Sequence, residues 1–76
     1  MDDDEYIQTP EGMNSARELI QYLSPGTTTS ARSIRRKWEQ LASDRKRIVQ
    51  AYFRRKERTA TALNTRERRV YNAINA

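Results

Sequence analysis

The chain has 76 residues, 36% of them hydrophobic, with no cysteine, no histidine and a formal net charge of +5. Because neither a disulfide nor an ordinary zinc site can form, association with a second copy is the remaining way to stabilise so small a core. The mean hydropathy of -1.06 and the lack of a long apolar run exclude a transmembrane helix and a secretory signal, and predict a cytoplasmic protein.

Charge is divided unequally along the chain. Residues 1–30 carry six acids and one base, whereas residues 31–76 carry fourteen bases and four acids. The basic charge is therefore concentrated where a polyanion would be held. Residues 1–9 show no periodicity and are predicted to be an acidic disordered tail, followed by a single helical domain at 10–76.

The first predicted helix covers residues 11–23. Thr9 and Pro10 give a start pattern, with proline at the first helical position, and Ser24, Pro25 and Gly26 end the helix. The short polar connection that follows favours two helices packed antiparallel as a hairpin.

The second predicted helix is long, from residue 30 to residue 62, because no glycine or proline follows Gly26. Apolar residues recur in it at helical spacing and predict a buried stripe. This predicted core and dimer stripe comprises Ile34, Trp38, Leu41, Ile48 and Tyr52. Val49 and Phe53 lie beside it and widen the apolar surface beyond what the first helix can cover, which favours a homodimer.

Three threonines and Asn64 lower the helix propensity of residues 59–65, so a turn is expected there, followed by a short third helix at 65–75. The predicted fold class is all-α. It is a helical hairpin with a long basic second helix and a short third helix, dimerising into a four-helix bundle.

A second stripe on the long helix is basic and polar and points away from the apolar one. Its residues are candidates for RNA binding: Arg36, Gln40, Ser43, Arg47, Gln50, Arg54 and Arg58, with Arg32 added. A solvated surface is the ordinary explanation for a run of charge, but such a surface would mix acids and bases, and this row contains no acid. From Arg36 to Arg54 a helix rises about 27 Å, long enough to cross more than one groove of a duplex.

The aromatic residues and Arg45 of the long helix are weaker candidates for binding. Trp38 and Tyr52 could stack on unpaired bases, but both lie on the apolar stripe, which favours core packing. Arg45 also falls on that stripe, and either marks its edge or pairs with an acid such as Asp44 or Glu18. With no cysteine, no histidine, no paired carboxylates and no phosphate-binding loop, the chain is not expected to be an enzyme or to hold a cofactor or a metal.

The run IRRKWEQL at residues 34–41 resembles the long helix of the small RNA-silencing suppressors of insect nodaviruses. The similarity continues without a gap to Arg47 and Arg54, and covers about the middle third of the chain. It implies a homodimer that lies along duplex RNA of any sequence, with Arg36, Arg47 and Arg54 as contact residues. It also implies a viral suppressor in the host-cell cytoplasm, which shields duplex RNA from a host dicing nuclease and sequesters small RNAs.

The main alternative is a small helical DNA-binding transcriptional regulator. Residues 64–71 somewhat resemble the start of a winged-helix segment, but no second helix or wing follows them. A helix-turn-helix would also need a short turn inside the long helix, and the sequence shows none. A third class is a structural helical module whose charge is incidental.

Overall fold

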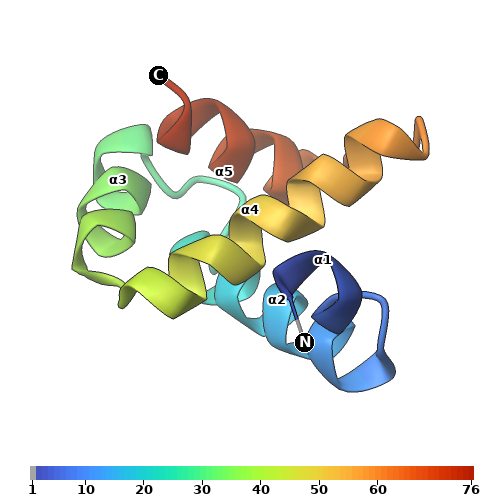
Figure 1. Ribbon diagram of the computed structural model, residues 1–76. Helices are drawn as coiled ribbons and strands as arrows, with labels where there is room; N and C mark the ends of the chain where they lie inside the picture. Colours follow the sequence, from blue (N-terminus) through green and yellow to red (C-terminus); the bar gives the residue numbers. More distant parts are fainter. Residues whose placement is uncertain (1) are drawn as a thin grey trace.

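The computed structural model describes residues 2–76, and this part of the chain contains helices joined by loops, without strands (Figure 1). The all-α prediction is therefore confirmed. The five helices found in these residues are α1 (Asp3–Tyr6), α2 (Pro10–Leu23), α3 (Ala31–Gln40), α4 (Ser43–Arg58) and α5 (Thr65–Ile74).

Three of the four longer helices begin at side-chain caps. The hydroxyl of Thr9 accepts a hydrogen bond from the amide of Gly12 at the start of α2, with Pro10 at the first helical position as predicted. Ser30 caps α3 in the same way, through the amide of Ser33. At the start of α5, Asn64 and Glu67 form a reciprocal capping box, which satisfies two amides that would otherwise lack a partner.

The prediction of a disordered tail at 1–9 is wrong for residues 2–9, and Met1 lies outside the described residues. Asp2 caps the short helix α1 by accepting a hydrogen bond from the amide of Glu5 at 2.8 Å. Ile7 is only 1% exposed, so one apolar side chain anchors the segment to the rest of the protein. The sequence pattern does not reveal this contact, because one isoleucine among acidic and polar residues forms no periodic apolar pattern.

The prediction of one helix over 30–62 is also wrong, because α3 ends at Gln40 and α4 begins at Ser43. Leu41 and Ala42 are both extended, with ψ angles of 146° and 152°. A continuous helix of that length would span about 50 Å, whereas the longest dimension of the folded chain is 32 Å. The break lets α3 pack against α5 while α4 packs against α2, so both bury apolar surface that a straight rod would expose.

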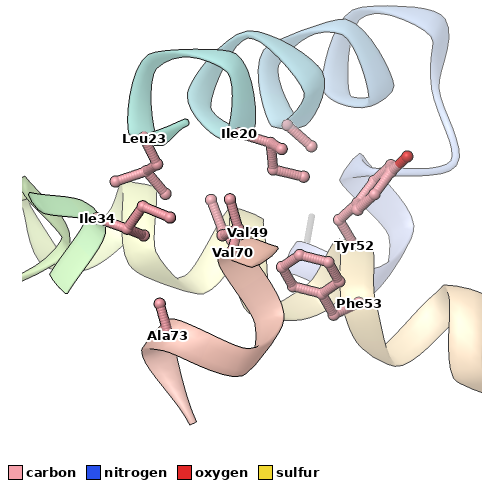
Figure 2. Close-up of a cluster of buried hydrophobic side chains, with 9 residues drawn as sticks. Ile20, Leu23, Ile34, Val49, Tyr52, Phe53, Val70 and Ala73 are labelled. Carbon is pink, nitrogen blue, oxygen red and sulfur yellow. The ribbon is translucent and has the colours of Figure 1, made fainter. Parts of the chain in front are cut away.

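The core lies where α2, α3, α4 and α5 meet (Figure 2). Ile34 and Tyr52 are buried as predicted, but Trp38, Leu41 and Ile48 are only partly buried at its edge. Val49 and Phe53 are buried within one chain, and the ring of Phe53 meets that of Tyr71 edge to face, with centroids 5.4 Å apart. Val49 and Phe53 therefore give no support for a homodimer, because α5 covers the apolar surface that α2 leaves uncovered.

After α4 the chain reverses through Ala60, which has a positive φ of 53°. The amide of Thr61 bonds back to the carbonyl of Lys56 at 2.9 Å, which satisfies a carbonyl in the last turn. This reversal ends α4 four residues before the predicted end at 62 and directs the chain into α5. None of the helices in residues 2–76 is long and apolar enough to cross a membrane.

Candidate nucleic-acid interface

An arginine-lined groove of about 590 Å³ runs between α3 and α5. In Figure 1 these are the green and red helices, which lie next to each other. The arginines that line the groove are Arg32, Arg35 and Arg36 from α3 and Arg69 from α5. Glu39 is the one acidic side chain among its lining residues, so the groove carries an excess of positive charge.

The packing of α5 decides where Arg69 lies. The guanidinium of Arg66 donates to the carbonyls of Ser24 at 2.8 Å and Pro25 at 3.3 Å, which fastens the start of α5 to the loop between α2 and α3. One turn later, Arg69 approaches the carbonyl of Thr29 at 3.5 Å, at the edge of the groove. Arg66 therefore has a structural role, whereas Arg69 is exposed and faces α3.

The predicted basic row does not lie on one surface, because the break at Leu41 and Ala42 divides it. Arg32 and Arg36 fall in the groove between α3 and α5. Arg47 and Arg54 lie on α4, where each contacts a carboxylate of α1. The break thus places Arg32 and Arg36 on one surface of the protein and Arg47 and Arg54 on another.

The remaining candidates are dispersed. Gln40 lines a different hollow, on the side of α2, and Ser43 is the exposed first residue of α4. Gln50 shares a small hollow of about 280 Å³ with Arg54, between α4 and α5, and Arg58 is exposed at the end of α4. The amide and hydroxyl members of the row are therefore not gathered with the arginine groove.

Two arginines of the groove were not among the candidates. Arg35 belongs to the basic run of the sequence, but it lies outside the straight row expected for an unbroken helix. Arg69 could not be placed, because nothing in the sequence shows that α5 packs against α3. The pair Ser43 and Asp44 is the one local signal for the break, since polar and acidic residues favour the first turn of a helix.

Three of the partly buried apolar residues line a second hollow. This hollow has a volume of about 820 Å³ and lies between α2 and the junction of α3 with α4. Leu19, Leu41 and Ile48 line it, together with the exposed ring of Tyr22. Glu18, Asp44 and Arg45 lie at the same hollow, so its rim carries charges of both signs.

The ionisable group with the clearest pKa shift is Tyr52, a structural residue that lies outside the groove. Burial, and next the hydrogen bond to Glu67, raise the pKa of Tyr52 to about 12. Within residues 2–76 no three acidic side chains gather closely enough to hold a metal ion. The arrangement of charge in the groove suits the recognition of anionic oxygens, because guanidinium groups donate several hydrogen bonds to phosphate.

Comparison of the chain with protein-family models, curated proteins and solved structures found no match.

Proposed function

We propose that the protein binds nucleic acid and holds the phosphate backbone in the groove between α3 and α5. The observation that carries the proposal is the convergence of Arg32, Arg35, Arg36 and Arg69 on one groove with a single acid. Contacts of arginine with phosphate supply affinity that does not depend on base sequence and that falls with salt. We therefore propose a non-enzymatic binding protein rather than a reader of one sequence.

Duplex RNA is the first candidate ligand, because the resemblance of residues 34–41 to viral silencing suppressors implies it. On this proposal the protein would shield duplex RNA from dicing and sequester small RNAs. Because α3 and α4 are separate helices, the protein has no straight basic rod that could lie along a duplex. The choice of RNA thus depends on the resemblance, while the choice of a polyanion depends on the groove.

Duplex DNA is the second candidate, and the break between α3 and α4 favours it. A regulator of the helix-turn-helix kind needs a short turn between two helices, and Leu41 and Ala42 provide one. The two helices make few close backbone contacts, however, whereas α3 packs mainly on α5. This packing differs from that of the usual helix-turn-helix motif, so we rank duplex DNA below duplex RNA.

A homodimer is also part of the proposal. The hollow lined by Leu19, Leu41 and Ile48 leaves apolar surface accessible, and the opposite charges of Asp44 and Arg45 on its rim would complement each other across a two-fold axis. This surface replaces the four-helix bundle seam predicted along an unbroken helix.

A competition gel shift tests the proposed function. A labelled RNA duplex is bound at physiological salt and challenged with duplex RNA of the same and of unrelated sequence, with duplex DNA and with single-stranded RNA. The proposal predicts that duplex RNAs of unrelated sequence compete equally well and that single strands compete poorly. Selective competition by one DNA sequence would favour the regulator, and no binding of any probe would contradict a nucleic-acid function.

A further inference from the structure

The short helix α1 packs against α4 (Figure 1). Asp3 Oδ2 is 3.3 Å from Nε of Arg47, and Asp4 Oδ1 is 3.4 Å from Nη2 of Arg54. Two neighbouring carboxylates therefore reach two arginines that are separated by about two turns of α4. Within the described residues, these contacts bring the acidic start of the chain onto its basic half.

The ion pairs do not hold α1 in place by themselves. Both arginines are exposed, and exposed ion pairs contribute little to stability. The segment is held instead by the buried side chain of Ile7 and by close backbone packing at Gly12, where an added Cβ would lie 1.9 Å from the carbonyl oxygen of Tyr6. Apolar packing thus positions carboxylates whose own contacts are weak enough to be exchanged.

We infer that Arg47 and Arg54 form a second phosphate-binding surface, and that the carboxylates of Asp3 and Asp4 occupy it until nucleic acid displaces them. This inference rests on the proposed function. A carboxylate and a phosphate present similar anionic oxygens to a guanidinium, so the two acids and a nucleic-acid backbone compete for the same donors. Only the partly exposed side chains of Asp3 and Asp4 need to move aside, while Ile7 stays buried.

The occupied surface would weaken binding and make it less dependent on salt than the number of exposed arginines suggests. Each phosphate neutralised by a basic residue adds about 0.9 to the slope of log affinity against log salt. A protein that binds only through the α3–α5 groove would lack the contribution of Arg47 and Arg54. Removing the carboxylates of Asp3 and Asp4 would restore the contribution of these two arginines.

The test compares two variants with the same change in charge. Asp3→Asn with Asp4→Asn removes the carboxylates that contact α4. Glu5→Gln with Glu11→Gln removes two exposed carboxylates that form no ion pair within residues 2–76. Affinity for a fluorescein-labelled RNA duplex and for a matched DNA duplex is measured by anisotropy over a range of salt, after circular dichroism has shown unchanged helix content.

The inference predicts that the Asp3 and Asp4 variant binds about tenfold more tightly than wild type at ~0.1 M salt, with a salt slope steeper by up to about 1.8. The Glu5 and Glu11 variant should show a clearly smaller gain. Equal gains in the two variants would mean that net charge alone acts and would overturn the inference.

A second comparison separates this inference from the proposed function. In a background of Arg47→Ala with Arg54→Ala, changing Asp3 and Asp4 to asparagine should give no more affinity than changing Glu5 and Glu11 to glutamine. A full gain in that background would show that the acids act elsewhere. Failure of every protein to bind either duplex would instead reject the proposed function, whereas normal binding with equal gains would reject only the role of α1.

Discussion

The buried hydroxyl of Tyr52 donates a hydrogen bond to the carboxylate of Glu67, and this contact joins α4 to α5. Glu67 is only 6% exposed, and its other oxygen accepts a hydrogen bond from the amide of Asn64 at 2.9 Å. Lys56 lies 3.9 Å away and supplies a compensating charge. One carboxylate thus fixes both the start of α5 and its attachment to α4, and so helps to hold Arg69 beside α3.

Tyr52→Phe is expected to destabilise the protein by about 1–3 kcal/mol, because it removes a buried hydrogen bond to a carboxylate. Urea denaturation followed by circular dichroism measures the loss. Tyr22→Phe is the matched control, since that ring is 50% exposed and its hydroxyl is accessible to water. Equal effects of the two substitutions would show that the contact between Tyr52 and Glu67 contributes nothing.

Stability should also fall at high pH through Tyr52. The pKa of this residue is raised from 10.0 to about 12 in the folded protein, so its contribution is complete below pH 10 and is lost as the pH rises toward 12. The two-unit difference corresponds to about 3 kcal/mol at most. The difference in unfolding free energy between wild type and Tyr52→Phe should therefore shrink over this range, and a constant difference would contradict the assignment.

The sequence predicts the elements that have local signals. Thr9 with Pro10 marks the start of α2, and Ser30 marks the start of α3. Asn64 lies in the expected turn before the last helix, where it forms a capping box with Glu67. Caps and prolines act within one turn of a helix, so they can be recognised without knowledge of the tertiary structure.

The features that depend on tertiary packing could not be predicted in this way. Leu41 and Ala42 have no helix-breaking side chain, and the chain breaks there because α3 and α4 bury apolar surface against different partners. Ile7 is buried although its neighbours are acidic and polar. For the same reason, the sequence predicts only part of the candidate groove. Arg32 and Arg36 were predicted, whereas Arg69 lies beside them only because α5 packs against α3.

Gly12→Ala should loosen α1 from the rest of the protein. A Cβ at this position would lie 1.9 Å from the oxygen and 2.6 Å from the carbon of the Tyr6 carbonyl, so the backbone must shift. We expect a loss of about 1–3 kcal/mol in stability and faster hydrogen exchange at residues 3–7.

Gly26→Ala is the control for this substitution, because the nearest atom to its Cβ would be the hydroxyl oxygen of Thr29 at 3.7 Å. It should leave exchange at residues 3–7 unchanged. Unaltered exchange in Gly12→Ala would show that the close approach to Tyr6 does not hold α1.

The proposed dimer predicts that Leu41→Glu yields a monomer, because it places a charge in the apolar hollow beside Leu19 and Ile48. Sedimentation velocity of wild type and variant measures the change. Ala62→Glu adds the same charge at an exposed position away from the hollow and should remain a dimer. A monomeric wild type, or a dimeric Leu41→Glu, would contradict this surface.

The most direct test of the central claim is a salt titration of duplex binding by two double variants that lose the same charge. Arg35→Ala with Arg69→Ala removes two arginines of the groove, whereas Arg58→Ala with Arg68→Ala removes two exposed arginines that line neither the groove nor the proposed dimer surface. We expect the groove variant to bind at least about tenfold more weakly, with a salt slope lower by about 1.8, and the control to change much less. Equal weakening in both variants, or an unchanged affinity in the groove variant, would contradict a nucleic-acid interface between α3 and α5.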